Sequence, residues 1–163
     1  MTVQELKSAF ESAYGKASEA VYFSPGRVNL IGEHTDYNGG AVFPCALSFG
    51  TYLLLAKNDK SVMNFKSLNQ PEIISLGFDQ LTTPLDKSWV NYPLGVIAQF
   101  VKRGIAITQG YDILIWGNVP NGAGLSSSAA LEVVTAYAFN DQLGTGFNRT
   151  VLAQIGQKSE HEF

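Results

Sequence analysis

Two stretches of the sequence contain several side chains that could bind a ligand or take part in catalysis. The first is GRVNLIGEHTDYNGG at residues 26–40. It places an arginine, two carboxylates, a histidine and a threonine close together, with four glycines between them. The pattern keeps neither the period of two of a strand nor the 3.6 period of a helix, so it predicts an irregular loop. Three interpretations stay open on these residues: a site for a hydroxyl-rich ligand, a metal site built from Glu33, His34 and Asp36, or an exposed turn.

The second stretch, VPNGAGLSSSAALEVV at residues 119–134, predicts an anion-binding loop. An expected strand precedes its glycines and an expected helix follows them. The free N–H groups and the positive dipole end of that helix therefore lie beside three serine hydroxyls. Gly122 and Gly124 carry no Cβ, which lets a ligand approach the backbone closely. Phosphate is the expected occupant.

Three alternatives compete with phosphate binding at this loop. Helix capping by Ser126 would use one serine and would not need two glycines before it. A P-loop is excluded because no lysine follows Gly124. A dinucleotide fingerprint needs an acidic residue after a second parallel strand. Asp141 stands at about the right separation, roughly 20 residues, but it ends a predicted helix instead.

The elements that must position these stretches follow from periodicity and from turn residues. The last expected helix has Asn148 as its cap, and strands that come before helices predict an α+β arrangement. Helices are expected at 3–14, 93–103 (ending at Gly104), 125–143 and 148–163. Strands or apolar runs are expected at 19–26 (stopped by Pro25-Gly26), 41–49, 51–56, 61–66, 72–78 and 111–118.

Composition narrows the class of protein. Hydrophobic residues make up 45% and charged residues 15% of the 163, which predicts one folded domain rather than disorder. The net charge of −3, with no basic cluster, argues against nucleic acid as a partner. Apolar runs are too short to span a bilayer, and the first residues do not resemble a secretory signal. Cys45 is the single cysteine, so we expect a cytoplasmic protein in which Cys45 is a small buried residue rather than a nucleophile.

Taken together, PGRVNLIGEHTDYNGG and PNGAGLSSSAALE closely resemble the first two signature regions of galactokinases. Galactokinases belong to a larger family of small-molecule kinases with homoserine, mevalonate and phosphomevalonate kinases. WVNYPLGV at 89–96 is similar to a further galactokinase segment, and the resemblance runs from about Val21 to Phe163. It implies transfer of the ATP γ-phosphoryl group to the anomeric hydroxyl of D-galactose, with Mg²⁺. The implied fold is the N-terminal α+β domain, a mostly antiparallel sheet with helices packed on one side.

The same resemblance implies roles for individual residues. Arg27 matches an arginine that stabilises the transferred phosphoryl group, although an ordinary ion pair with Glu33 or Asp36 is its alternative. Ser128 and Glu160 match the Mg²⁺ ligands, and His161 is left as structural. The matched sugar-binding residues are Glu33, His34, Thr35 and Asp36. The matched ATP-binding residues are Gly122, Ala123, Gly124, Leu125, Ser126, Ser127 and Ser128, with Ser67 as a weaker match.

The chain departs from the galactokinase pattern after Glu160. The family's catalytic aspartate, in a GIMDQ-like stretch, its third glycine-rich signature and a sugar-contacting tyrosine have no match here. We expect one N-terminal kinase domain over 1–163, with a galactose segment at about 10–60, an ATP-loop segment at about 110–163 and no C-terminal domain. Such a fragment would be inactive alone. N-acetylgalactosamine kinases share these loops, and a non-catalytic sugar and ATP sensor is the other alternative, although the intact GLSSSAA favours an enzyme.

Overall fold

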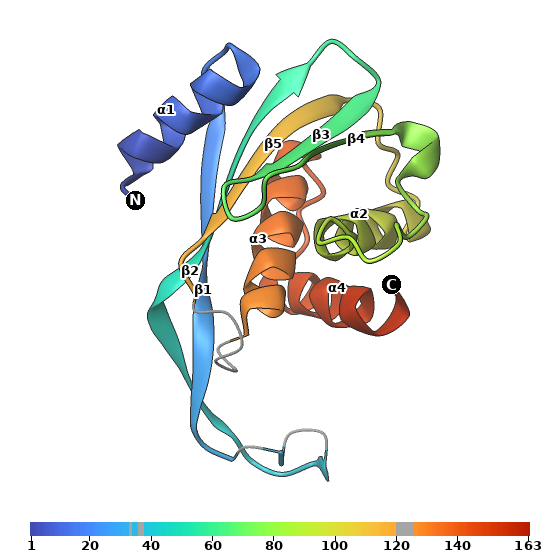
Figure 1. Cartoon of the computed structure of the whole chain (residues 1–163). Helices are drawn as coiled ribbons and strands as arrows, with labels where there is room; N and C mark the ends of the chain where they lie inside the picture. The colour runs from blue at the N-terminus through green and yellow to red at the C-terminus, as the bar shows by residue number, and fades with distance from the viewer. Residues whose placement is uncertain (33, 36–37, 120–125) are drawn as a thin grey trace.

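The structure is a computed structural model that describes residues 1–32, 34–35, 38–119 and 126–163 (Figure 1). Its elements are α1 Val3–Tyr14, β1 Ala20–Ile31, β2 Phe43–Asn58, β3 Val62–Ser67, β4 Ile73–Gly77, the 3₁₀ turn η2 Phe78–Gln80, α2 Asn91–Lys102, β5 Gly110–Gly117, α3 Ser127–Gln142 and α4 Arg149–Glu162. All four predicted helices are confirmed to within two residues, as are the strands predicted at 61–66, 72–78 and 111–118. Asn148 caps α4 as predicted, because its side chain accepts a hydrogen bond from the Val151 amide.

Five strands form one mixed sheet in the order β1-β2-β5-β3-β4. β1–β2, β2–β5 and β3–β4 are antiparallel, and β3–β5 is parallel. The α+β class with a mostly antiparallel sheet is therefore confirmed. β5 lies at the centre, and its run of Ile113, Leu114 and Ile115 is buried because layers cover both faces there.

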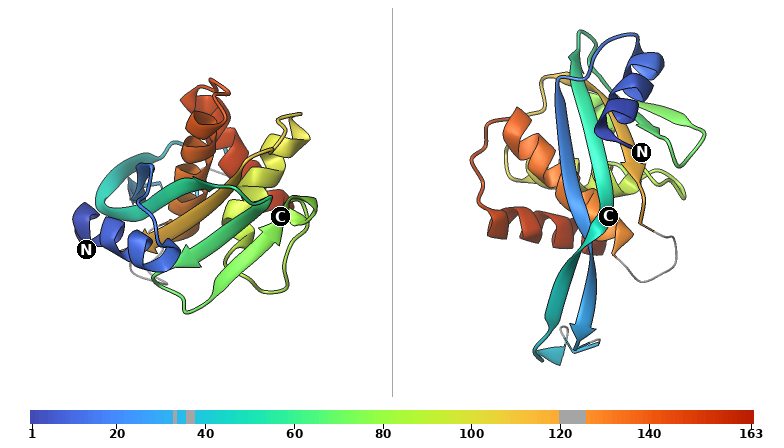
Figure 2. Two further views of the ribbon diagram at one scale, coloured as in Figure 1. Left: turned by 90° about the horizontal axis from the view of Figure 1, so that it is seen from above. Right: turned by 90° about the vertical axis from the view of Figure 1, so that its left-hand side faces the viewer.

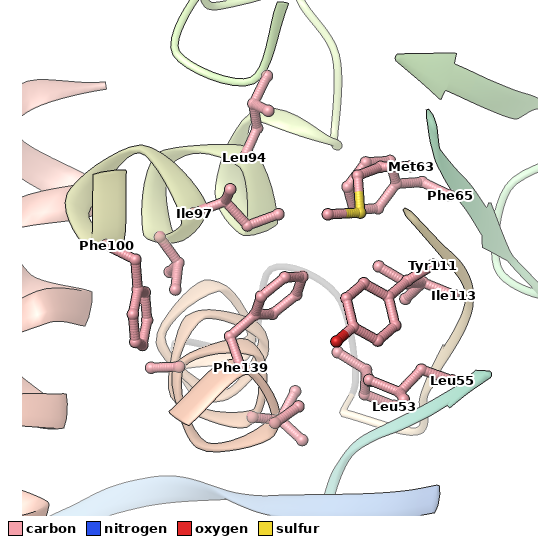
Figure 3. Packing of buried hydrophobic residues seen from close by; sticks show 14 of the residues in the cluster. Leu53, Leu55, Met63, Phe65, Leu94, Ile97, Phe100, Tyr111, Ile113 and Phe139 are labelled. Carbon is pink, nitrogen blue, oxygen red and sulfur yellow. The ribbon is translucent and has the colours of Figure 1, made fainter. Parts of the chain in front are cut away.

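Helices α2, α3 and α4 pack on one face of the sheet, as expected, whereas α1 lies on the opposite face (Figures 1 and 2). The main core lies between the sheet and the three helices (Figure 3). It brings together aromatic and aliphatic side chains such as Phe65, Phe100, Tyr111 and Phe139. The smaller cluster beneath α1 contains Leu6, Phe10, Leu54, Ala56 and Leu114.

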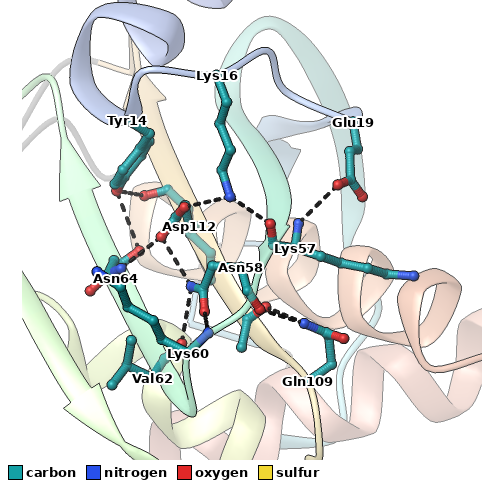
Figure 4. A network of polar contacts seen from close by, with 12 residues as sticks. Tyr14, Lys16, Glu19, Lys57, Asn58, Lys60, Val62, Asn64, Gln109 and Asp112 are labelled. Atoms are coloured by element: carbon teal, nitrogen blue, oxygen red, sulfur yellow. Dashed lines mark hydrogen bonds and ion pairs between the residues drawn. The ribbon is translucent and has the colours of Figure 1, made fainter.

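A polar network fastens the end of α1 to the sheet (Figure 4). The Lys16 ammonium lies 2.8 Å from Oδ2 of Asp112, whose Oδ1 accepts from Asn58 at 3.0 Å and from Asn64 at 2.6 Å. The Tyr14 hydroxyl donates to the Ile113 carbonyl at 2.8 Å. Burial alone would raise the pKa of Asp112, but the hydrogen bonds from Lys16, Asn64 and Asn58 outweigh it and hold that pKa below its ordinary value.

β1 and β2 continue beyond the body of the molecule as a two-stranded ribbon, formed by residues 27–31 and 43–46 (Figures 1 and 2). The predicted strand end at Pro25-Gly26 was therefore wrong, and so was the prediction that the whole of 26–40 is loop. β1 is an edge strand, where a missing N–H is tolerated, and a register shift between Pro25 and Arg27 absorbs the local irregularity. The two apolar runs at 41–49 and 51–56 form one continuous strand, β2.

Cys45 lies in this ribbon, and it is exposed. The prediction that it is a small buried residue was wrong. The ribbon extends past the three helices, so none of the described helices covers its faces at that point (Figure 1). Its apolar side chains share this exposure, including Leu30, Ile31 and Phe43.

Candidate active site

The first turn of α3 supplies one side of the site. Ser126 stands at the N-cap position with a φ of 59°, and its side chain makes no capping hydrogen bond. The alternative in which Ser126 serves only as a helix cap is therefore not observed. The helix begins at Ser127, so the amides of its first turn have no intrahelical partners and carry the positive end of the dipole.

A hydroxyl and a carboxylate meet beside this turn. The Ser128 hydroxyl donates to Oε1 of Glu160 at 3.1 Å, which joins the first turn of α3 to the last turn of α4. Within the described ranges, no group of three or more His, Cys, Asp or Glu side chains converges as a metal site. This pair therefore offers two oxygen ligands and leaves any others to be supplied by a substrate or by water.

A pocket opens next to α3, between the ends of β3 and β5 and the start of α2. We name it the serine pocket, and its lining includes Ser67, Asn69, Trp89, Tyr92, Ser127 and Ser128. Asn69 connects the chain after β3 to the end of β5 in this pocket. Its side-chain oxygen accepts from the Gly117 N–H at 2.9 Å, and its side-chain nitrogen donates to the Gly117 carbonyl at 3.0 Å. Ser67 is largely buried, and its hydroxyl accepts a hydrogen bond from the backbone N–H of Asn69 at 3.1 Å. The structure thus brings Ser67 to the same pocket as Ser127 and Ser128.

A second pocket adjoins the first and shares Trp89 and Tyr92 with it. We name it the glutamate pocket, and its lining also includes Glu132, Ser159, Glu160 and Phe163. Glu132 is only 2% exposed, and burial, followed by the negative charge of Glu160, raises its pKa from 4.5 to about 8. No described residue offers a hydrogen-bond partner to its Oε1 atom or to the indole Nε1 of Trp89.

The described residues between β1 and β2, which include Gly32, His34 and Thr35, lie at the far end of the ribbon, away from the start of α3 (Figure 1). His34 has a φ of 61°, and the Thr35 hydroxyl lies 2.6 Å from the Gly32 carbonyl and 3.0 Å from the Ala41 carbonyl. Thr35 therefore shares its one hydroxyl hydrogen between two carbonyls and holds the turn closed. Gly32 is required here, since its φ is 98° and a Cβ would lie 2.6 Å from the Ala41 oxygen.

Comparisons with known proteins give this geometry a context. Residues 8–57 match the model of the galactokinase galactose-binding signature, and residues 91–163 match that of the N-terminal domain of GHMP kinases. The chain is 45% identical to a galactokinase of Clostridium beijerinckii and 44% identical to one of Streptococcus mutans. These matches cover 99% and 100% of this chain and 42% of each relative.

Over its whole length the chain is similar to galactokinases, and it carries their galactose-binding signature. Its structure resembles that of Lactococcus lactis galactokinase complexed with galactose, with a TM-score of 0.93 and 36% identity over 100% of this chain and 43% of the other. Methanococcus jannaschii mevalonate kinase shows the same fold, with a TM-score of 0.81 at 20% identity over 89% of this chain and 47% of that one. The chain thus spans about two fifths of the length of the galactokinases that it matches.

The residues matched to galactokinase motifs fall into three groups. Ser67, Ser127 and Ser128 line one pocket, and Glu160 contacts Ser128. Arg27 is an exposed residue of β1 opposite Ala46, and His34 and Thr35 lie at the end of the ribbon. The remaining matched residues lie outside the described ranges: Glu33, Asp36, Gly122, Ala123, Gly124 and Leu125.

Three residues of the site were missed from the sequence, and two carried a usable signal. Glu132 follows Ser128 by four residues, which places the two on one face of α3. Trp89 stands in the galactokinase-like segment at 89–96, next to the start of α2. Asn69 carried no such signal, because its role depends on contact with β5.

Within the described part of the chain, none of the helices combines the length and the apolar character that a membrane span requires.

Proposed function

We propose that this protein is a galactokinase, which transfers the γ-phosphoryl group of ATP to the anomeric hydroxyl of D-galactose to give galactose 1-phosphate. The observation that carries the proposal is the galactose-binding signature over residues 8–57. N-acetylgalactosamine kinase activity and a non-catalytic sensor remain outcomes of the test below. A cytoplasmic location is part of the proposal, because a single cysteine, Cys45, suits a reducing compartment.

The serine pocket is proposed to hold ATP. Trp89 and Tyr92 offer aromatic faces for a nucleotide base, and the unpartnered Trp89 N–H suits a ligand that carries hydrogen-bond acceptors. The phosphates are proposed to reach the start of α3, where free amides and the helix dipole favour negative charge. Ser67, Ser126, Ser127 and Ser128 would supply hydroxyl contacts, and Gly122, Ala123, Gly124 and Leu125 would supply backbone contacts.

The donor set fits Mg²⁺. A serine hydroxyl and a carboxylate meet at 3.1 Å, and Mg²⁺ in phosphoryl-transfer sites is held by one or two such oxygens together with substrate phosphates. Ser128 and Glu160 are the residues proposed to hold it. When bound, the cation neutralises charge on the phosphate oxygens.

The end of the ribbon is proposed to bind the sugar. Glu33 and Asp36 would accept hydrogen bonds from galactose hydroxyls, and His34 could donate or accept. Thr35 would act by holding the turn closed, since its hydroxyl hydrogen is already used. Arg27, on the strand that leads to this turn, is proposed to stabilise charge on the transferred phosphoryl group.

Calorimetry on the purified protein tests the proposal, with galactose, N-acetylgalactosamine and Mg²⁺–ATP as separate ligands. Galactose is expected to bind more tightly than its acetylated analogue. Asp36→Ala should weaken galactose binding about tenfold or more, because a hydrogen bond to a charged group contributes about 1.5–3 kcal/mol. ATP binding should change much less in that variant.

Tighter binding of N-acetylgalactosamine would overturn the assignment of the sugar. An equal loss of both ligands in Asp36→Ala would mean that the substitution damages the fold. Binding of both ligands by the whole enzyme without any phosphate transfer would instead support a sensor.

A further inference from the structure

The glutamate pocket contains a carboxyl group that the proposed function does not use. Glu132 lies one helical turn after Ser128 on α3 and is 2% exposed. It lines this pocket together with Glu160 and Ser159, and its Oε1 atom lacks a hydrogen-bond partner among the described residues. A buried polar atom without a partner is unfavourable, so this oxygen suits a ligand.

The groups around Glu132 define the chemistry of that ligand. Two carboxyl groups that face one another repel when both are ionised. A positive ion between them would remove the repulsion and would satisfy the open oxygen of Glu132. The Ser159 hydroxyl adds a neutral oxygen donor to the same pocket.

Glu132, Ser159 and Glu160 offer oxygen donors to this pocket, which favours a hard divalent cation over a metal that prefers nitrogen or sulfur. Lys87 also lines the pocket, but it is exposed and its long stem lets the ammonium stay in solvent.

We propose that Glu132 and Glu160 together hold a divalent cation in the glutamate pocket, with Oε1 of Glu132 as a ligand beyond the Ser128–Glu160 pair. The inference rests on the proposed function to the extent that Glu160 belongs to both sites. Cation binding can be measured without sugar or nucleotide, so the cation proposal and the kinase proposal can be refuted independently of one another. The competing arrangement is a single proton shared by the two carboxyls, with no cation.

The test measures Mn²⁺ binding to the purified protein without nucleotide or sugar, by electron paramagnetic resonance of the free ion. Glu132→Gln keeps the size of the side chain and removes its charge, and it should weaken Mn²⁺ binding about 10–100-fold. Glu162→Gln is the matched control. Glu162 is exposed in the last turn of α4, which also carries Glu160, but it pairs with Lys102 and does not line the pocket. Circular dichroism checks that each variant is folded, and Glu132→Asp replaces Glu132→Gln if the latter does not fold.

The position of the cation is tested with Tb³⁺, whose emission is sensitised by a nearby indole. The chain has two tryptophans: Trp89 lines the pocket, whereas Trp116 packs on Tyr52 and is not part of the pocket lining. Trp89→Phe should abolish the sensitised emission, and Trp116→Phe should retain it.

Equal Mn²⁺ affinity in folded Glu132→Gln and in the unsubstituted protein would overturn the proposal. So would a protein that binds no Mn²⁺, which is the result expected for a shared proton. Failure of the kinase proposal would appear elsewhere, in the binding of galactose and ATP.

Discussion

The Ser128 hydroxyl lies 3.1 Å from the Glu160 carboxylate, although the two residues are 32 positions apart in the chain. This contact joins the first turn of α3 to the last turn of α4 at the edge of the serine pocket. The geometry predicts that Ser128→Ala weakens Mg²⁺–ATP binding about tenfold or more, because a hydroxyl beside the phosphates is lost. The unfolding temperature should change little, since the contact is exposed. Ser61→Ala, in the exposed turn between β2 and β3, is the control and should bind ATP normally.

The raised pKa of Glu132 predicts how stability depends on pH. The folded protein keeps this proton up to about pH 8, whereas the unfolded chain releases it near 4.5. The folded state therefore binds more protons in that range, and the free energy of unfolding should fall as pH rises from about 4.5 to 8. Glu132→Gln should remove this part of the slope and raise stability at pH 8, measured by urea unfolding with a chelator present. An unchanged slope in the variant would show that Glu132 does not cause it.

The hydrogen bonds and the ion pair of Asp112 predict that this residue contributes to the stability of the fold and not to ligand binding. Asp112→Asn loses the ion pair with Lys16 and faces the Asn58 and Asn64 amides with a poorer acceptor, so it should destabilise the fold by about 2 kcal/mol or more. The lowered pKa of Asp112 means that its contribution is present above about pH 3.8 and is lost as pH falls through the lowered value. ATP binding should stay the same in the folded variant. Asp59→Asn, exposed in a nearby turn, is the control.

Two glycines in the helices predict opposite effects of alanine. A Cβ on Gly95 would lie 2.5 Å from the Ser159 oxygen and 2.9 Å from a Phe163 carbon, so Gly95→Ala should push α4 away from α2. We expect a loss of about 1–3 kcal/mol from overpacking, together with weaker Mg²⁺–ATP binding as Glu160 moves. At Gly156 the nearest atom would be 3.7 Å away, so Gly156→Ala should stabilise α4 by about 0.5–1 kcal/mol. Thermal unfolding of both variants checks the difference in sign.

The 163 residues contain no match to the galactokinase stretch that carries the catalytic aspartate. A polypeptide limited to these residues is expected to bind ATP without forming galactose 1-phosphate at a useful rate. Loss of a general base costs about 10²–10⁴-fold, and misplacement of the reactants adds to that loss. The measurement is sugar phosphate formed from galactose, ATP and Mg²⁺. Turnover comparable with that of a whole galactokinase would contradict the expectation.

Local signals predicted most of the fold. Helix α4 follows from its apolar spacing and from the Asn148 cap, and β5 follows from a short apolar run before glycine. The ribbon could not be predicted in this way. Pro25 and Gly26 are strong turn signals and predicted that the strand would end there. The strand continues because β1 is an edge strand, which tolerates a residue without a backbone N–H. The exposure of Cys45 has the same origin, since sequence does not reveal where a strand leaves the body of the protein.

Residues of the candidate site were predicted where neighbours in the sequence form a recognisable motif. Residues were missed where only tertiary packing brings them to the site. The serines of α3 stand in one stretch, so their phosphate role could be proposed at once. Glu160 was assigned only by resemblance, because an exposed helix residue has no pattern of its own. Glu132 and Glu160 line one pocket because α3 packs on α4, and periodicity alone does not give that packing.

The central position of β5 also determines the order in which the sheet can assemble. β2 and β3 are neighbours in the chain, yet β5 lies between them in the sheet. The β1–β2 and β3–β4 hairpins can each form early from local contacts, but in the described sheet β2 and β3 do not pair with each other, so the two hairpins become one sheet only when residues 110–117 have been synthesised. Nascent chains that end before Gly117 should therefore hold two separate hairpins with open inner edges, and the ribosome-bound protein would depend on chaperones during that interval.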